Sequence, residues 1–473
     1  MVRSPGTERR PIVQRIDHPD LGNASYLVRH RREGWAFVVD PVRDMDVYRR
    51  RMAEDGGSLD WVFETHLHND FLSGGRELAA RTGARLGAAA AARLRFPYVP
   101  LSDRREIRLD GWRLRVLASP GHTPEHLSYL LLTPDGSPAC LFSGGALMAG
   151  TAARPDLLGP AETLPLARQE WTTLRRRFQA LPDSLTVHPT HLGGSFCGVG
   201  ARAASRTTLG RERRTNRLLT APTYSAFLER YLSTDPFPSY YGAVRRRNQL
   251  GAPRVGDPLP PIPRLSAARV ERLLRQRGGV ALDTRTPEQF DRGHLPGSRF
   301  VGHDGPITAW IAAAADPRDR IVLVGERESE IESARRSLLR IGFDRIEGAL
   351  DGGVRAWASS GRPLKATRRS TMAELRKSME RGGPLAVVDV RAPSEFAWGH
   401  VPGAFSSPVD RLARSDLRDR IPPGVPVYVH CEYGTRSAVA VGLLESMGVG
   451  PVVHVLDGPT RWNAPRRRSP TPT

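Results

Sequence analysis

Apolar and polar positions along the chain follow two different patterns. In the C-terminal half, apolar runs of strand length alternate with segments that have apolar residues at helical spacing, as in VPVYVH (425–430) followed by SAVAVGLLESMG (437–448). This alternation predicts parallel α/β domains. The N-terminal half has strand-like runs around one helical segment, RELAARTG, and these runs are YLVRH, WAFVVD, WVFETH, RLRVLASPGH and HLSYLLL. That pattern predicts sheets layered against helices.

Proline marks the main boundary in the sequence. The stretches PFPSYY (236–241) and GAPRVGDPLPPIPR (251–264) exclude a long helix or a central strand and predict a stiff linker. Beyond it, DTRTPEQFDRGHLPG (283–297) and DVRAPSEFAWGHVPG (389–403) share Asp, Arg, Pro, Phe, Gly, His, Pro and Gly at one constant offset, which indicates a duplication. We therefore predict four segments, namely a first domain (1–245), a linker (246–264) and two repeats (265–366 and 367–473).

Composition restricts the functional classes. With 39% hydrophobic and 25% charged residues, the 473-residue chain is typical of globular proteins, and its apolar runs are too short for a membrane span. The net charge of +20 comes almost entirely from arginines scattered along the sequence, since Lys365 and Lys377 are the only lysines. We therefore expect no nucleic-acid partner. The three cysteines, Cys140, Cys197 and Cys431, predict free thiols in a reducing compartment. The charged start lacks the apolar run of a signal peptide, so we expect a cytoplasmic protein.

A candidate metal site follows one of the strand-like runs of the first domain. There His66, His68 and Asp70 form an H-x-H-x-D run that lets two imidazoles and a carboxylate converge on one cation, and these donors suit zinc or iron. The run is followed by SPGHTPEHLSYLL, FSGGALMAG and VHPTHLGGSFCG, which contain His122, Gly145 and His191. In this order and spacing, the first domain resembles the persulfide dioxygenases of the metallo-β-lactamase fold.

That resemblance implies an αββα metallo-β-lactamase sandwich with one iron ion. By position, two iron ligands fall on His66 and His122, whereas the third, an aspartate in the family, falls on Gly145. Phe71 is compatible with the family, because the residue at that position serves a second metal site that mononuclear dioxygenases do not use. One alternative is a zinc-type site of three histidines, His66, His68 and His122, with Asp70 nearby and His191 on a later loop. The other is a site without metal, whose histidines only form hydrogen bonds.

A second candidate site lies in the last repeat, where HCEYGTRSAVA (430–440) places Cys431 between a strand and a helix. The backbone N–H groups of such a loop and of a helix N-terminus stabilise a thiolate and receive an anionic donor, and Arg436 adds positive charge. With D-x-R and G-H-x-P-G upstream, this C-x-x-G-x-R motif resembles the rhodanese sulfurtransferases, which have parallel-sheet α/β domains. Its six-residue loop favours sulfur donors over the phosphatases, whose loop is longer.

The rhodanese resemblance implies covalent sulfur transfer. The Cys431 thiolate would take the outer sulfur of thiosulfate or a persulfide and pass it to a thiol, sulfite or cyanide. The substrate-contacting residues would be Glu432, Tyr433, Gly434 and Thr435. In the first repeat, Cys431 and Arg436 correspond to Gly325 and Glu330, so we predict a structural or docking module there.

The predicted domain order resembles the fused persulfide dioxygenase and sulfurtransferase proteins of bacterial sulfide detoxification. We predict a rhodanese-type sulfurtransferase of sulfane-sulfur metabolism, with one iron or zinc ion in the N-terminal domain. Its partners would be small-molecule sulfur donors and thiol acceptors, without nucleic acid or membrane, and the prediction leaves room for a homo-oligomer. Two alternatives are a zinc hydrolase that acts on a thioester, and a non-catalytic carrier or sensor in which Cys431 stores sulfur.

Overall fold

The computed structural model describes residues 10–53, 57–198, 206–233, 235–238 and 240–462. The first nine residues, which carry part of the signal-peptide argument, and the end of the predicted last repeat lie outside these ranges. The described residues form two compact units. The first unit contains the described residues up to Ser233, residues 240–261, and Leu339–Gly342. The second unit contains the other described residues, which are 235–238, Ile262–Leu338 and 343–462.

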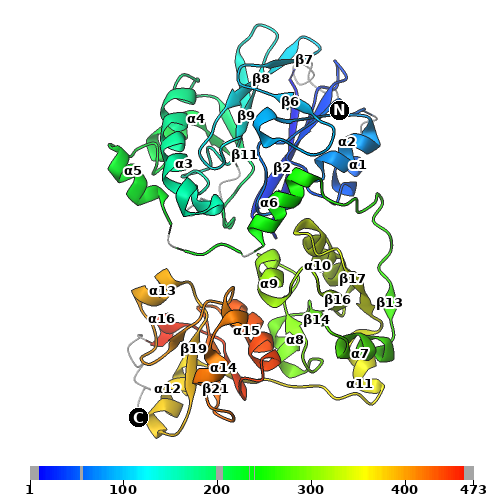
Figure 1. Cartoon of the computed structure of the whole chain (residues 1–473), viewed down its shortest axis with the longest axis vertical. Coiled ribbons are helices and arrows are strands. Elements are labelled where there is room, and N and C mark those ends of the chain that lie inside the picture. The colour runs from blue at the N-terminus through cyan, green and yellow to red at the C-terminus, as the bar shows by residue number, and fades with distance from the viewer. Residues whose placement is uncertain (1–9, 54–56, 199–205, 234, 239, 463–473) are drawn as a thin grey trace, which may run out of the picture. The chain divides into compact units, whose positions relative to one another are not determined.

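The first unit has two six-stranded sheets that face one another (Figure 1). The first sheet consists, in order, of β1 (Ile12–His18), β2 (Asn23–Arg29), β3 (Ala36–Val39), β4 (Trp61–Phe63), β5 (Arg85–Ala89) and β6 (Val99–Leu101). The second has the order β12-β11-β10-β9-β8-β7, and its strands are β7 (Glu106–Leu109), β8 (Trp112–Ala118), β9 (Leu127–Leu132), β10 (Pro138–Gly144), β11 (Thr186–Pro189) and β12 (Thr207–Thr208). Both sheets contribute to one core, in which the rings of Phe63 and Tyr129 lie 5.0 Å apart.

Helices cover the outer faces of these two sheets. Those beside the first sheet are α1 (Asp46–Ala53) and α2 (Gly75–Thr82), and those beside the second are α3 (Pro160–Thr172), α4 (Leu209–Thr215) and α5 (Tyr224–Tyr231) (Figure 1). A second apolar core joins Leu130 and Leu141 of the second sheet to Ala167 of α3 and Phe227 of α5. The predicted αββα sandwich is therefore confirmed.

One helix lies across the predicted end of the first domain. It is α6 (Tyr241–Leu250), which belongs to the first unit although the linker was expected to begin at residue 246. Val244 and Asn248 of α6 are buried. The segment limits drawn from the sequence stay a prediction.

The second unit contains two parallel sheets with the same strand order. The first repeat has the order β13-β17-β16-β14-β15, with β13 (Arg264–Leu265), β14 (Gly279–Asp283), β15 (Arg299–Phe300), β16 (Arg320–Val324) and β17 (Ile346–Leu350). The second has the order β18-β22-β21-β19-β20, with β18 (Arg368–Ser370), β19 (Ala386–Asp389), β20 (Phe405–Ser406), β21 (Val427–His430) and β22 (Val452–Val455). Within each sheet, every pair of neighbouring strands is parallel. The prediction of two parallel-sheet α/β domains is therefore confirmed.

The helices of the second unit connect these strands. They are α7 (Ala267–Arg275), α8 (Pro287–Arg292), α9 (Ile307–Ala314), α10 (Glu328–Arg340) and α11 (Gly353–Ser359), then α12 (Met372–Arg381), α13 (Pro393–Trp398), α14 (Leu417–Arg420), α15 (Thr435–Ser446) and α16 (Pro459–Trp462). Helix α15 packs against β15, and a Cβ at Gly442 would lie 3.0 Å from the Cα of Arg299. The absence of a side chain at Gly442 therefore permits close packing of the two repeats.

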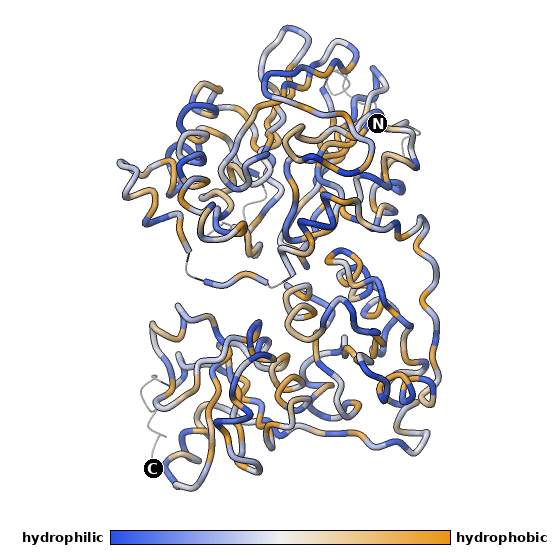
Figure 2. Tube along the Cα trace, in the orientation of Figure 1, coloured by the Kyte–Doolittle hydropathy of each residue, from blue (hydrophilic) through white to orange (hydrophobic). Residues whose placement is uncertain are grey.

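Apolar and polar stretches alternate along the whole chain (Figure 2). The strand β9 is buried at all six positions, and β21 is buried at all four. Among the residues described here, no helix combines the length and the hydropathy needed to cross a lipid bilayer.

Candidate functional site

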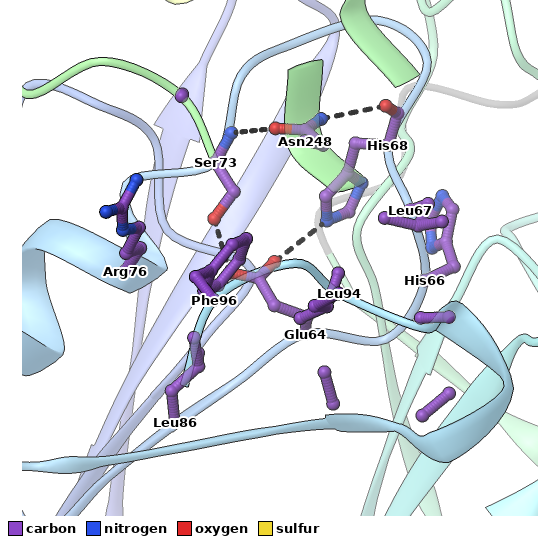
Figure 3. A pocket seen from close by; sticks show the side chains of 14 residues that line it. Glu64, His66, Leu67, His68, Ser73, Arg76, Leu86, Leu94, Phe96 and Asn248 are labelled. Carbon is purple, nitrogen blue, oxygen red and sulfur yellow. Dashed lines mark hydrogen bonds and ion pairs between the residues drawn. The ribbon is translucent and has the colours of Figure 1, made fainter. Parts of the chain in front are cut away.

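The loop after β4 brings histidines to the edge of the first sheet, and α6 holds this loop in place. Asn248 of α6 donates its Nδ2 hydrogens to the backbone oxygens of His68, at 2.9 Å, and Phe71, at 2.8 Å. Its Oδ1 accepts from the backbone N–H of Ser73 at 2.9 Å (Figure 3). The conformation of the histidine loop thus depends on a residue about 180 positions away in the sequence.

Two histidines from distant loops meet in the buried centre of the first unit. The Nε2 atoms of His66 and His191 lie 3.3 Å apart. Two nitrogens bound to one tetrahedral zinc ion, each at about 2.0 to 2.1 Å, would be separated by about 3.3 Å. The Nε2 atom of buried His122 has no hydrogen-bond partner among the described residues, and its ring centroid lies 4.9 Å from that of His66. This geometry suits nitrogen donors that share a cation.

His68 interacts with two carboxylates. Its Nε2 lies 3.2 Å from Asp40 and 3.4 Å from Glu64, and its ring stacks on Phe71. Burial lowers the pKa of His68, but Asp40 and Glu64 outweigh burial and raise the pKa to about 10. Among the described residues, the potential ligand atoms form three groups, which are His66 with His68 and His191, His122 with His191 and Cys197, and His68 with Asp40 and Glu64.

Asp70 lies beside His191. Its Oδ2 accepts from Asn23 at 2.7 Å and lies 3.4 Å from Nδ1 of His191, which also lies 3.0 Å from Oδ1 of Asn23. Burial raises the pKa of Asp70, but the adjacent His191 lowers it to about 2. The hydrogen bond between Nδ1 and Asn23 leaves Nε2 of His191 available as a ligand, so Asn23 and the adjacent Asp70 together are placed to orient that ring.

Asp40 and His126 are functional candidates that the sequence interpretation missed. Asp40 accepts from the backbone N–H and the hydroxyl of Thr65, each at 2.7 Å, and it also accepts from the hydroxyl of Thr190. It therefore ties the loops of His66 and His191 together. The ring of His126 stacks on His66, and its Nε2 accepts from the backbone N–H of Gly145 at 3.0 Å. The second histidine of SPGHTPEH is His126, and its position in this motif was the sequence signal that could have identified it.

Gly145 occupies a crowded position beside His122. A Cβ there would lie 2.8 Å from Cδ2 of His122 and 3.0 Å from Cβ of Ala153. An aspartate at this position would thus require a neighbour to shift. The buried thiol of Cys197 joins His122 and His191 in one group of potential ligands.

A narrow apolar pocket lies on the outer side of His68 (Figure 3). Its walls include Leu86, Leu94 and Phe96, and the side chain of Glu64 accepts from the hydroxyl of Ser73 at one side. The cavity volume is about 30 Å³, above the roughly 10 to 15 Å³ that a cavity needs to hold a water molecule. The pocket therefore suits only a small group.

In the second unit, Cys431 lies at the end of β21, directly before the loop that starts α15. The loop contains Gly434, whose φ of 84° lies in the left-handed region, and the helix begins at Thr435. Cys431 is 2% exposed, whereas Tyr433 is 86% exposed. Glu432 lies 3.6 Å from Arg391 and accepts from the hydroxyl of Thr460. The loop thus has a buried thiol and a solvent-facing rim.

Arg436 of this loop is paired with a carboxylate. Its Nη1 and Nη2 donate to the two oxygens of Glu395 on α13, at 2.5 and 2.8 Å. Burial raises the pKa of Glu395, but the contact with Arg436 outweighs burial and lowers it. Sequence reasoning missed Glu395, because 41 residues separate it from Arg436.

The corresponding loop of the first repeat is filled by its own side chain. Oε2 of Glu330 accepts from the backbone N–H groups of Glu326 and Arg327 at 3.1 and 3.2 Å, and Oε1 accepts from Nε of Arg327 at 2.7 Å. These backbone donors are therefore already engaged. A Cβ at Gly325 would lie 2.7 Å from the hydroxyl oxygen of Thr284, so a cysteine would also be crowded there.

Comparisons with protein families match both units. Residues 18–191 match the metallo-beta-lactamase superfamily, and residues 266–360 and 371–464 each match the rhodanese-like domain. A hydroxyacylglutathione hydrolase of Acidiphilium cryptum (strain JF-5) is 34% identical over 229 residues, which cover 46% of this chain and 85% of that protein. Another, from Methylococcus capsulatus (strain ATCC 33009 / NCIMB 11132 / Bath), is 33% identical over 225 residues, covering 46% and 82%.

A solved structure extends the similarity beyond the first unit. The metallo-beta-lactamase from Staphylococcus aureus subsp. aureus COL has a TM-score of 0.64 and 26% sequence identity with this chain. The alignment covers 72% of this chain and 98% of that one. It therefore covers more of the chain than the curated hydrolases do.

Proposed function

Because the chain belongs to the metallo-β-lactamase superfamily and also carries two rhodanese-like domains, we propose that it is a rhodanese-type sulfurtransferase with a metal-dependent N-terminal domain. The observation that carries the proposal is the position of Cys431 between a buried strand and the N-terminus of α15. Backbone N–H groups at such a position stabilise negative charge on a sulfur atom.

The proposed reaction has two steps. In the first, the Cys431 thiolate attacks the outer sulfur of thiosulfate, the S–S bond breaks, and sulfite leaves with the bonding electron pair. In the second, an acceptor such as cyanide or a thiolate attacks the outer sulfur of the Cys431 persulfide, and the Cys431 thiolate returns. The rim residues Glu432, Tyr433, Gly434 and Thr435 would contact the donor or the acceptor.

Replacement of the nucleophile tests this function. Cys431→Ser should abolish sulfur transfer from thiosulfate to cyanide, because a hydroxyl stays protonated near neutral pH. Cys140→Ser is the matched control, since burial raises the pKa of Cys140 to about 12 and the thiol lies in the core. Mass spectrometry should find one added sulfur atom on the Cys431 peptide after exposure to thiosulfate. Wild-type turnover in Cys431→Ser would contradict the assignment.

The first unit has a donor set that fits a divalent metal ion. Its donors are imidazoles with one nearby carboxylate and one thiol, a set that suits zinc or iron. We propose that His66, His122 and His191 hold the ion, with Asp70 orienting His191 and with His68 and Cys197 close by. A bound ion would supply Lewis-acid activation of water or substrate. Gly145 leaves the site without the carboxylate that the persulfide dioxygenases use.

Thioester hydrolysis is the second candidate function. It is favoured by the relatives named hydroxyacylglutathione hydrolase, which are 34% and 33% identical to this chain. Elemental analysis of protein purified without added metal, repeated on His122→Ala, tests the metal site. Hydrolysis of a hydroxyacylglutathione thioester by Cys431→Ser protein would assign this activity to the first unit. Equal metal content in wild type and His122→Ala would contradict the proposed set of metal ligands.

A further inference from the structure

Four buried polar side chains form a continuous chain of contacts that starts at the candidate nucleophile. Sγ of Cys431 lies 3.6 Å from Oγ of Ser437, which lies 3.0 Å from Nε2 of His454. Nδ1 of His454 lies 2.8 Å from Oδ2 of Asp291. Each of these four residues is at most 2% exposed. The thiol is thus connected to a carboxylate through groups that can carry a proton.

The carboxylate belongs to the other repeat. Ser437 is on α15 and His454 on β22 of the second repeat, whereas Asp291 is on α8 of the first. At the offset that aligns the two repeats, Asp291 corresponds to Ala397 and His454 corresponds to Gly348. Neither repeat could therefore build this contact alone. The close packing at Gly442 brings α15 against the first repeat, so the two halves of the contact meet in one unit.

A purely structural role does not account well for this arrangement, because burying these polar groups is energetically unfavourable. Burial of a carboxylate and an imidazole costs several kcal/mol unless their hydrogen bonds are satisfied, and apolar residues of similar size would often be at least as stable. Oδ1 of Asp291 has no hydrogen-bond partner among the described residues, and Arg369 is an ion-pair partner at 3.5 Å from Oδ2. The polar chain thus carries an energetic cost in the core.

The hydrogen-bonding directions permit proton transfer. The Asp291 carboxylate can only accept, so Nδ1 of His454 must carry hydrogen, and Nε2 of the neutral ring can accept from the Ser437 hydroxyl at 3.0 Å. That hydroxyl can rotate to this nitrogen from the backbone oxygen of Gly434, which also lies 3.0 Å away. The Ser437 oxygen can then accept from the Cys431 thiol. When that thiol ionises, its proton passes to Ser437 as the Ser437 proton passes to Nε2. The products are a thiolate, with Ser437 as its donor, and an imidazolium, which can donate to the backbone oxygen of Gly434 at 3.0 Å.

We propose that Asp291 of the first repeat is a positioning residue for the active site of the second. It holds His454 in the orientation and tautomer in which this ring takes the Cys431 proton through Ser437. The proposal rests on the sulfurtransferase function proposed above, and it follows the logic by which a buried carboxylate orients the histidine of a catalytic triad. The first repeat would then contribute to the chemistry although Glu330 fills its own loop.

The test uses the full chain and three variants. Asp291→Asn removes the negative charge of that carboxylate, and Ser437→Ala interrupts the series of polar contacts without changing Asp291. Glu288→Gln is the control, because Glu288 is a half-exposed carboxylate on the same helix. The ultraviolet absorbance of the Cys431 thiolate is titrated against pH, as the difference between each protein and its Cys431→Ser counterpart. The other charged or titratable groups near Cys431 and His454 remain unchanged, and they include Arg369, the Arg436–Glu395 pair, the Arg391–Glu432 pair, and His430 with Asp389.

In both Asp291→Asn and Ser437→Ala, the midpoint of the thiolate titration should rise by about one pH unit or more. At neutral pH, kcat for thiosulfate and cyanide should fall by about a hundredfold with little change in KM, and activity should recover as pH rises. The double variant should lose no more than either single variant, because both interrupt one path. Glu288→Gln should match wild type in all respects.

An unchanged titration midpoint in folded Asp291→Asn and Ser437→Ala would overturn the proposal. An equal fall in kcat and an equal rise of the titration midpoint in Glu288→Gln would also overturn it, since the effect would then come from the surface charge of α8. If Asp291→Asn fails to fold, Ser437→Ala decides the question within the second repeat. Because the thiolate titration needs no turnover, a wild-type protein that transferred no sulfur would refute the proposed function while this measurement still tested the Asp291 contact.

Discussion

The proposed sulfur transfer assigns the docking of an anionic donor to Arg436, but Glu395 already binds both terminal nitrogens of Arg436. Arg436→Ala removes the cation, and the donor that remains to Glu395 among the described residues is the backbone N–H of Ala392 at 3.0 Å. A thiosulfate ion would then approach the Glu395 carboxylate without the Arg436 cation beside it. We expect the KM for thiosulfate to rise and kcat to change little, because the Cys431 nucleophile is retained.

The size of the effect follows from the contact and its exposure. A charge-assisted hydrogen bond contributes about 1.5 to 3 kcal/mol. The side chains of Arg436 and Glu395 remain 25% and 37% exposed, so solvent screening favours the lower end of that range. About 1.5 kcal/mol corresponds to a roughly tenfold increase in KM.

Glu395→Gln is the matched variant that separates binding from loop structure. It removes the competing negative charge and keeps a side chain of nearly the same shape, so the KM for thiosulfate should fall below that of wild type. The assay is steady-state transfer from thiosulfate to cyanide at two salt concentrations, and salt should diminish both changes. If Glu395→Gln raises the KM as much as Arg436→Ala does, the pair maintains the loop and does not bind the donor.

Three further predictions concern other parts of the chain. Gly145→Asp should increase the iron content per chain measured by elemental analysis, whereas Gly145→Ala, which adds the same crowding against His122, should not; equal iron in both would refute the positional assignment. Gly325→Cys should add no thiosulfate:cyanide activity to a Cys431→Ser chain, because the position is crowded by Thr284 and the backbone donors of the loop are occupied. Burial lowers the pKa of His188 from 6.5 to about 4, so the folded state favours the neutral ring. The contribution of His188 to the free energy of unfolding is therefore complete above pH 6.5 and is lost as the pH falls through about 4, by up to roughly 3 kcal/mol. In urea unfolding experiments, His188→Phe should make the free energy of unfolding depend less on pH over this range.

The local order of residues was sufficient to predict several features. The constant offset between the two repeats, the apolar strand before Cys431 and the helical spacing after it specified a parallel α/β unit with a cysteine between a strand and a helix. Similarly, the H-x-H-x-D run predicted a metal site, and its order and spacing with His122 and His191 carried the family resemblance that implied a metallo-β-lactamase sandwich. Such predictions succeed because strand and helix periodicity, together with turn residues, are properties of neighbouring positions.

Other features were decided only by contacts between residues far apart in the chain. His66 meets His191 across 125 positions, and Asp291 meets His454 across 163. Whether His68 contacts a metal or the carboxylates of Asp40 and Glu64 depends on how the loop after β4 packs, since the same side chain can form either contact. In each repeat a loop follows the corresponding strand, but Glu330 accepts from the backbone N–H groups of this loop in the first repeat, while Arg436 pairs with Glu395 in the second. These partners are selected by burial, because a polar group removed from water must find whichever donor or acceptor the folded chain places within reach.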